Sequence, residues 1–308
     1  MTNKDGAIKT AQKKGREKDG ARKPARLSIG IVGPGRAGIA LAVALKKSGV
    51  RVLGLHGRRR KRVPAGLRLT VGGLPAWLPG ADVILLAVQD DQLQPLVAQL
   101  AESGGLRSRQ VVLHLSGVRP TSSLSPLTPH GVFIGGMHPL MTAMGKPAID
   151  ARNLAAATFA LEGDVKAVRA ARLLVRRLGG RAVRLRAESR PRYHAGAVFA
   201  ANYVVTMLAV AEDLLVEAGF ARRAARAALI PLTGAALANS ATNGPSRALT
   251  GPIVRGDAAT VRLNMRALTD EQRALYRAAG EATLRLAQRA GRVDPARATD
   301  IGRVLHES

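Results

Sequence analysis

Three glycines at fixed spacing near the start of the chain predict a dinucleotide site. Gly33, Gly35 and Gly38 form the pattern G-x-G-x-x-G, between the apolar segment 27–32 and apolar residues at helical spacing in 39–45. This context predicts a buried parallel strand followed by a helix. Gly33 would then allow the tight turn, Gly35 would let a pyrophosphate approach the backbone, and Gly38 would let the helix pack closely on the sheet. The helix N-terminus offers free N–H groups to the phosphates. The alternative is a glycine-rich turn without a ligand.

The end of the next predicted strand, 50–55, bears on the choice of cofactor. Gly57, Arg58 and Arg59 follow it closely, and no acidic residue occurs in 51–74. An acidic residue here would bind the ribose 2′-OH of NAD, whereas guanidinium groups suit a 2′-phosphate. We therefore expect NADP(H). The alternative is that these arginines only reflect the arginine-rich composition.

Strands and helices alternate through the first half of the chain, which predicts a doubly wound parallel sheet, an α/β Rossmann domain. The expected strands are 67–71, 81–88, 111–115, one beginning at 132–134, 158–161 and 182–185, with a helix that Asp90 or Asp91 caps and that continues to Ala101, and another at 165–178. Ligands bind at the carboxyl ends of such strands. The expected cofactor contacts are Gly33, Pro34, Gly35, Arg36, Ala37, Gly38, Gly57, Arg58, Arg59, Val88, Gln89 and Ser116.

The pattern after Arg192 is helical, and it predicts an all-α second domain. Helices are expected at 194–218, 222–239, 258–268 and 270–289, with a loop at 240–257. The run 195–211 is apolar enough to suggest a membrane span. It is slightly short for one, contains Asn202, and is followed at once by Glu212 and Asp213. We expect a buried central helix instead.

Length and composition fit two domains. The chain has 308 residues, of which 46% are hydrophobic and 3% aromatic, and it has no cysteine, which excludes disulfides and thiolate metal sites. The six histidines are dispersed, so no metal site is expected. The expected organisation is a disordered basic tail at 1–24, a Rossmann-like domain at 25–190, and a helical substrate and dimerisation domain at 191–308.

The net charge of +27 raises nucleic-acid binding as an alternative function. Three features favour a general arginine bias: the arginines are scattered, stacking aromatics are scarce, and no nucleic-acid-binding motif is visible. We expect no specific nucleic-acid partner. The N-terminus lacks the apolar core of a signal peptide, and we expect a cytoplasmic protein.

The first half of the chain is similar to the NADP-binding domain of the 6-phosphogluconate dehydrogenase-like superfamily. From about Leu27 onward, the chain resembles a two-domain bacterial family whose C-terminal half is catalogued as a domain of unknown function, and which includes alternative ketopantoate reductases. The residues that carry the resemblance are Gly33-Pro34-Gly35-Arg36-Ala37-Gly38, Val88-Gln89-Asp90-Asp91, His114-Leu115-Ser116-Gly117, Met137-His138-Pro139-Leu140, Tyr193-His194-Ala195, Asn202, Leu249-Thr250-Gly251-Pro252-Ile253 and Arg255-Gly256-Asp257. The resemblance implies a second domain like the C-terminal domain of 6-phosphogluconate dehydrogenase.

Two positions depart from the family pattern. Asn264 stands where members often carry a histidine, and Val198 stands where the wider superfamily often has a catalytic lysine, four residues before Asn202. Valine cannot transfer a proton, so another group must supply it.

The candidate catalytic residues follow from the needs of hydride transfer to a carbonyl. His194 is the first candidate proton donor because histidine titrates near neutral pH, and Asn202 lies on roughly the same helix face. Arg255 could bind a carboxylate, oriented by Thr250 and Asp257. His138 is placed near the carboxyl edge of the sheet. For each, the alternative is structural: a helix cap for His194, a core hydrogen bond for Asn202, a turn for His138, and an ion pair for Arg255 with Asp257.

These observations predict an NADP(H)-dependent oxidoreductase with its active site between the two domains. The resemblance alone names 2-dehydropantoate, a small 2-oxo acid of pantothenate biosynthesis, as the substrate. A reductase of another carbonyl or of an imine fits nearly as well, and a non-catalytic NADP-binding sensor or scaffold is a further alternative. The long apolar helices suggest a homodimer.

Overall fold

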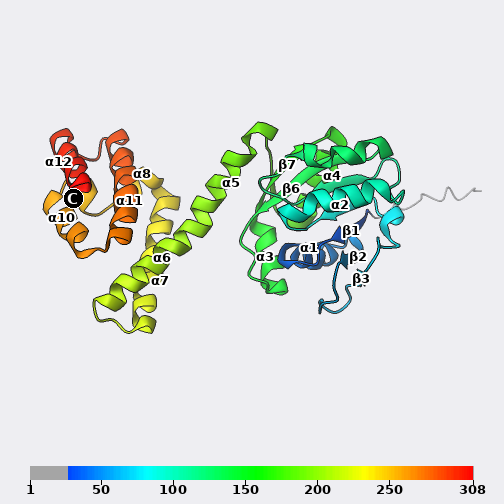
Figure 1. Ribbon diagram of the computed structural model, residues 1–308, viewed down its shortest axis with the longest axis horizontal. Helices are drawn as coiled ribbons and strands as arrows, with labels where there is room; N and C mark the ends of the chain where they lie inside the picture. Colours follow the sequence, from blue (N-terminus) through cyan, green and yellow to red (C-terminus); the bar gives the residue numbers. More distant parts are fainter. Residues whose placement is uncertain (1–26, 308) are drawn as a thin grey trace, which may run out of the picture. The chain divides into compact units, whose positions relative to one another are not determined.

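The computed structural model describes residues 27–307, and the expected tail at 1–24 lies outside them. The chain divides into two compact units, one ending at Ala197 and the other beginning at Val198. Figure 1 labels the helices and strands of each unit. The boundary was expected after residue 190, which is the first residue of the helix Arg190–Val198. The observed boundary lies seven residues later, near the end of that helix.

The first unit is built on a single twisted sheet, as the alternation of strands and helices predicts. In the described residues its strands are β1 (Ser28–Val32), β2 (Arg51–Gly57), β3 (Leu69–Val71), β4 (Val83–Leu86), β5 (Val111–His114), β6 (Phe133–Leu140), β7 (Thr158–Gly163) and β8 (Arg181–Arg184). Their order is β3-β2-β1-β4-β5-β6-β7-β8, and all neighbouring pairs are parallel except β6 with β7. From β1, the strand order runs to β2 and β3 in one direction and to β4 and the later strands in the other. The order therefore reverses between β1 and β4, and the carboxyl ends of these two strands form a topological switch point.

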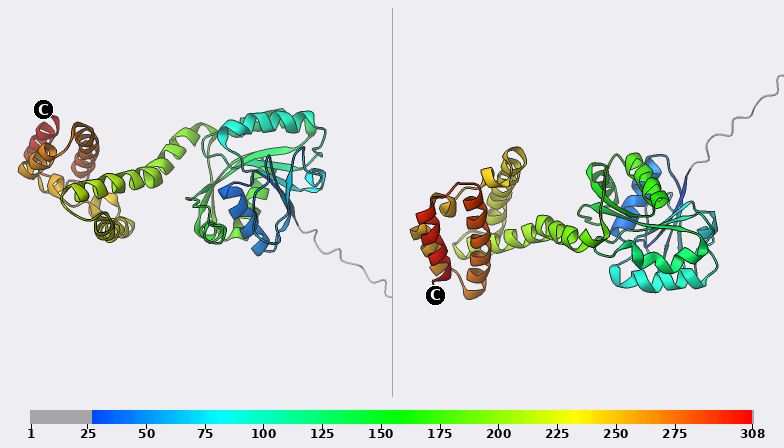
Figure 2. Two further views of the ribbon diagram at one scale, coloured as in Figure 1. Left: turned by 60° about the horizontal axis from the view of Figure 1, so that its bottom comes forward. Right: turned by 90° about the horizontal axis from the view of Figure 1, so that it is seen from above.

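Helices cover both faces of this sheet (Figure 2). Apolar residues of α1 (Arg36–Lys47), α3 (Pro147–Ala156) and α4 (Val165–Leu178) pack on one face. On the other face, α2 (Asp90–Glu102) and the 3₁₀ segment η2 (Thr121–His130) form a second core with the strands. Two short 3₁₀ turns, η1 (Leu78–Gly80) and η3 (Ala187–Ser189), complete the connections. The expected Rossmann domain is confirmed.

Two local interpretations of the sequence do not hold in the first unit. The structural alternative for His138, a turn after its strand, is wrong, because β6 continues through Leu140, where it pairs antiparallel with β7. The α2 helix begins after Gln89, and no side chain caps it; Asp90 and Asp91 lie in its first turn instead. In that position their negative charges interact favourably with the positive end of the helix dipole.

The second unit is all helical. Its elements are the π-helical turn η4 (Phe199–Tyr203), α6 (Val204–Glu217), α7 (Arg222–Asn243), α8 (Pro245–Ala248), α9 (Pro252–Arg255), α10 (Ala258–Ala267), α11 (Asp270–Arg289) and α12 (Pro295–His306). The helix α5 (Arg190–Val198) leads into it. Segments α9 to α12 enclose an apolar core that includes Val261, Ile301 and Leu305. The expected loop at 240–257 is wrong in part, because α7 runs to Asn243 and two short helices begin at Pro245 and Pro252, where proline suits the first helical turn.

The apolar helix is not buried within its own chain, contrary to expectation. The continuous helical stretch Ala187–Glu217 contains an 18-residue window with mean hydropathy 1.5, none of which is buried. It is the one helix of the described residues that is long and apolar enough to cross a membrane, which alone is weak evidence for a span. Side chains of α6 and α7 such as Val205 and Leu232 are each 67% exposed. The two helices are joined by Glu212, which accepts hydrogen bonds from Arg222 and Arg226.

Candidate functional site

The glycine turn after β1 has the geometry that its sequence predicts. Gly33 has φ +107°, in the region that favours glycine, and a Cβ here would overlap the carbonyl of Ala87. Gly38 lies against the Gly33 carbonyl, so a Cβ would prevent α1 from packing so closely. Gly35 is the N-cap of α1. Because glycine has no side chain to cap the helix, the first N–H groups of α1 remain available to an anion.

A cavity of about 380 Å³ opens beside this turn. Its lining combines the turn with the ends of β2 and β4 and the start of α2: Val32, Gly33, Pro34, Gly35, His56, Gly57, Arg58, Gly72, Ala87, Val88, Gln89, Gln92, Pro95, Leu96 and Gln99. Arg58 Nη1 donates a hydrogen bond of 2.7 Å to Gln92 Oε1, which holds the guanidinium at the cavity wall. The cavity therefore offers free helix N–H groups at one wall and a positive charge at another, which fits a phosphorylated dinucleotide.

Seven of the predicted cofactor contacts line the cavity: Gly33, Pro34, Gly35, Gly57, Arg58, Val88 and Gln89. Arg36, Ala37, Gly38, Arg59 and Ser116 are not among its lining residues. Arg36 instead donates to the carbonyl of Ala143. The Ser116 hydroxyl accepts hydrogen bonds from the N–H groups of Val118 and Arg119, so it shapes the turn after β5.

Two of the predicted catalytic residues meet at this turn after β5. A Cβ on Gly117 would lie 2.7 Å from His194 Cδ2 and 2.9 Å from His138 Nε2, so both imidazoles border its main chain. The two rings are 6.5 Å apart between centroids. His138 Nδ1 lies 2.7 Å from Tyr193 Oη in a hydrogen bond. The structure thus gathers His138, Tyr193 and His194 around Gly117, at the carboxyl edge of the sheet.

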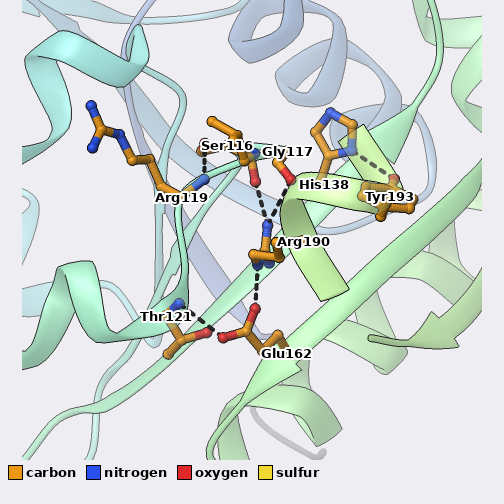
Figure 3. A network of polar contacts seen from close by, with 9 residues as sticks. Ser116, Gly117, Arg119, Thr121, His138, Glu162, Arg190 and Tyr193 are labelled. Atoms are coloured by element: carbon orange, nitrogen blue, oxygen red, sulfur yellow. Dashed lines mark hydrogen bonds and ion pairs between the residues drawn. The ribbon is translucent and has the colours of Figure 1, made fainter. Parts of the chain in front are cut away.

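A buried ion pair lies beneath this group (Figure 3). Arg190, the first residue of α5, is fully buried; its Nε donates to Glu162 Oε2, and its Nη1 donates to the carbonyl of Ser116 at 2.7 Å and to that of Gly117 at 3.4 Å. Burial alone would raise the pKa of Glu162, but hydrogen bonds from Arg190 and the Thr121 amide lower it below its usual value. Arg190 therefore fastens α5 to the turn that carries Gly117.

The buried charge of Arg190 also sets the protonation of two histidines. Burial and Arg190 lower the pKa of His114 to about 3 and that of His138 to about 4. For His138, His194 acts in the same direction and Asp90 opposes it. His114 is fully buried, and its ring nitrogens have no hydrogen-bond partner among the described residues. Both imidazoles are therefore neutral at physiological pH.

The remaining predicted catalytic residues belong to the second unit. Asp257 caps α10, where its carboxylate accepts hydrogen bonds from the Thr260 amide and hydroxyl. Both bonds lower the pKa of Asp257, and the bond from the Thr260 hydroxyl has the larger effect. Asn202 and Thr250 are exposed, and Arg255 is exposed at the end of α9. Asn264 donates to the hydroxyl of Tyr276.

Sequence reasoning missed Arg190 and Glu162. Arg190 is one of 48 basic residues, and nothing in its neighbours marks it as buried. The available signal was its position three and four residues before Tyr193 and His194, which puts all three on one helix face. In the described residues, no group of three or more His, Asp or Glu side chains is placed to hold a metal ion.

The fold and the glycine turn define a two-unit Rossmann-type nucleotide-binding protein. The chain matches the model of a Rossmann-like domain over residues 13–139 and that of a domain of unknown function (DUF2520) over residues 157–283. This combination, a Rossmann-like domain followed by that domain of unknown function, confirms the predicted two-domain family architecture. No curated protein sequence matches the chain.

Solved structures share this fold across most of the chain. A protein described as a candidate NADP oxidoreductase from Bacteroides fragilis is 21% identical with a TM-score of 0.70, over 83% of this chain and 97% of that one. Protein TM1727 from Thermotoga maritima is 20% identical with a TM-score of 0.65, over 86% and 100%. A reductive aminase from Aspergillus terreus, in complex with NADPH and ethyl levulinate, is 16% identical with a TM-score of 0.59, over 90% and 99%.

Proposed function

We propose that the protein is an NADP(H)-dependent oxidoreductase that reduces a C=O or C=N group of a small molecule. The cavity beside the Gly33 to Gly38 turn carries this proposal, because it combines a helix N-terminus with the Arg58 guanidinium. The similar structures described as an NADP oxidoreductase and as an NADPH complex support the same cofactor.

The residues that would hold the cofactor are those of the cavity wall. The N–H groups at the start of α1 would bind the pyrophosphate, and Arg58, held by Gln92, would bind the 2′-phosphate. Val88 and Gln89 at the end of β4 would border the ribose and the nicotinamide. When bound, NADPH supplies the hydride.

The substrate class proposed is a small 2-oxo acid, with 2-dehydropantoate as the named candidate from the family resemblance. Arg255 would bind its carboxylate, with Thr250, Asn202 and Asp257 as further candidates in the second unit. His138 and His194 at Gly117 would face the reacting carbonyl. A cyclic imine such as 1-pyrroline-5-carboxylate is the alternative substrate.

We also propose a cytoplasmic homodimer that uses the apolar side chains of α6 and α7. Val205 and Leu232 are examples of large apolar residues that the chain leaves exposed there. Exposed apolar side chains that gather into a large patch mark association sites.

The proposed function is tested by mixing the purified protein with NADPH and a panel of 2-dehydropantoate, other 2-oxo acids and 1-pyrroline-5-carboxylate. Loss of nicotinamide absorbance with one member would support the proposal and name the substrate class. Tight NADPH binding without turnover on the whole panel would favour a non-catalytic NADP-binding protein. Absence of NADPH binding would contradict the proposal altogether.

A further inference from the structure

The α5 helix presents three polar side chains to the carboxyl edge of the sheet. Arg190, Tyr193 and His194 are spaced i, i+3 and i+4 and therefore share one helix face. Each reaches a different group of the sheet: Arg190 the carbonyls of Ser116 and Gly117, Tyr193 the ring of His138, and His194 the main chain at Gly117. The helix face is thus matched to the turn after β5 and to the end of β6.

Arg190 fixes this arrangement because it is fully buried and bonded in several directions. Its guanidinium meets the Glu162 carboxylate on β7 and two carbonyls of the turn after β5. Gly136 on β6 lies against Arg190 Nη2, and a Cβ at this position would collide with it. The first turn of α5 is therefore held in place, and with it the position of the Tyr193 hydroxyl.

His138 faces groups from several elements. Arg190, Tyr193 and His194 face it from α5, Asp90 from the start of α2, and His114 from β5. Burial and the charge of Arg190 outweigh Asp90, so the pKa of His138 is about 4 and its ring carries a single N–H at neutral pH. Burial raises the pKa of Tyr193, against the charge of Arg190, so its hydroxyl keeps its proton.

We propose that Tyr193 is the proton donor of the reduction, with His138 Nδ1–H donating a hydrogen bond to Tyr193 Oη. This proposal rests on the proposed function and names a catalytic residue for it. With Nδ1–H as the donor, the Tyr193 hydroxyl proton is free to bond to a substrate oxygen. Arg190 and Glu162 are positioning residues, because they hold the helix and the turn rather than touch the substrate.

The proton step balances without a further reagent. When the carbonyl carbon gains the hydride, the π electron pair moves onto oxygen, and that oxygen takes the proton from Tyr193 Oη. The Oη–H bond breaks and the product alcohol forms. The resulting tyrosinate is stabilised by the hydrogen bond from His138 Nδ1–H until it takes a proton from water. Neutral His138 is a poor donor itself, since losing its one N–H proton would leave an imidazolate.

The kinetic test compares Tyr193→Phe with Arg192→Gln, a variant of the exposed neighbouring residue on the same helix. With a substrate of the panel, Tyr193→Phe should lower kcat by about 10²–10⁴-fold, the usual contribution of a general acid. KM and the Kd for NADPH should change little, since the hydroxyl acts mainly in the transition state. Arg192→Gln should retain most of kcat. The opposite ranking of the two variants would overturn the proposal.

A second measurement needs neither cofactor nor substrate. Nitrogen-15 NMR of histidine-labelled protein, with His138 assigned by comparison with His138→Asn, should show its proton on Nδ1 at neutral pH. Tyr193→Phe should shift that Nδ1 signal while folding and thermal stability remain close to wild type. A proton on Nε2 would overturn the proposal, because Tyr193 would then have to donate its proton to His138.

The two measurements separate the failures. If the wild-type protein oxidises NADPH with no member of the panel, the proposed function fails and the donor role fails with it. If it turns over but His138 carries its proton on Nε2, only the donor role fails. Turnover that Tyr193→Phe abolishes, together with an Nδ1 proton on His138, supports both.

Discussion

Arg190 and Glu162 form a buried ion pair that joins the first residue of α5 to β7. The Glu162 carboxylate also accepts a hydrogen bond of 2.9 Å from the Thr121 amide, so the contact joins three elements. The Arg190 side chain is fully buried and that of Glu162 is 8% exposed. A pair in such surroundings keeps its charges only while both partners are present.

Removal of one partner should therefore destabilise the protein strongly. Glu162→Gln leaves the Arg190 charge uncompensated, and we expect the free energy of unfolding to fall by about 3–5 kcal/mol. Urea unfolding followed by circular dichroism measures the change. Glu281→Gln is the matched control, since Glu281 pairs with Arg285 at the surface. It should cost no more than about 1 kcal/mol. Equal effects of the two variants would contradict the structural role of the buried pair.

The two glycines of the turn should respond differently to alanine. Gly33→Ala puts a Cβ onto the Ala87 carbonyl in a backbone conformation that strains L-residues, so it should lower thermal stability and abolish NADPH binding together. In Gly35→Ala, the new Cβ would lie 3.9 Å from the Ala87 carbonyl oxygen, which is an ordinary contact distance, so the variant should fold normally. Its methyl group would meet the pyrophosphate, so NADPH binding should weaken by at least about tenfold. Unchanged NADPH binding by Gly35→Ala would place the cofactor elsewhere.

Stability should fall as the medium is acidified from neutral pH. An unfolded histidine takes up its proton below about pH 6.5, whereas folded His114 remains neutral down to about pH 3 and His138 down to about pH 4. The unfolded state thus binds more protons in this range, and each histidine lowers the free energy of unfolding by up to about 1.4 kcal/mol per pH unit.

The contribution of His114 can be isolated by substitution. His114→Leu removes one titrating group and should show a flatter decline of stability between about pH 6.5 and pH 5, above the range of most carboxylates. Urea unfolding at several pH values gives the slopes. If His114→Leu and the wild type decline in parallel, the imidazole does not titrate as its burial requires.

The exposed apolar side chains of α6 and α7 should control oligomeric state. A charge placed there, as in Leu232→Glu or Val205→Glu, should convert a dimer into a monomer, because the carboxylate would have to be buried on association. Leu263→Glu on α10 is the control, since Leu263 is 66% exposed on a different helix. Light scattering at micromolar concentration reads the result. A monomeric wild-type protein would contradict the dimer.

Much of the sheet could be predicted, because strands such as β1 and β4 are short, buried apolar runs that local sequence alone reveals. The limits of β6 could not, since the apolar run 132–134 covers only its beginning, whereas residues 133–136 pair with β5. Its continuation contains Gly135, Gly136 and Pro139, which look like a turn, and pairing with the antiparallel partner β7 extends the strand to Leu140. The exposure of α6 could not be predicted either, because apolar composition does not show whether a helix is covered by its own chain.

The candidate site could be predicted where local sequence determines geometry. The glycine turn and Arg58 line the cavity because they follow strand ends directly. The group at Gly117 depends instead on three distant segments that the fold brings together, from β5, β6 and α5. His138 and His194 could be named as single residues, but their contact with Tyr193 and the buried charge of Arg190 required the tertiary structure.

The most direct test of the account is a fluorescence titration of the protein with NADPH and with NADH at fixed salt. It is repeated with Arg58→Ala, with Arg60→Ala as a control because Arg60 lies outside the cavity lining. We predict tighter binding of NADPH than of NADH, with the preference reduced at least about tenfold by Arg58→Ala and retained by Arg60→Ala. If the wild-type protein binds neither nucleotide, the glycine turn is structural and the central claim is wrong.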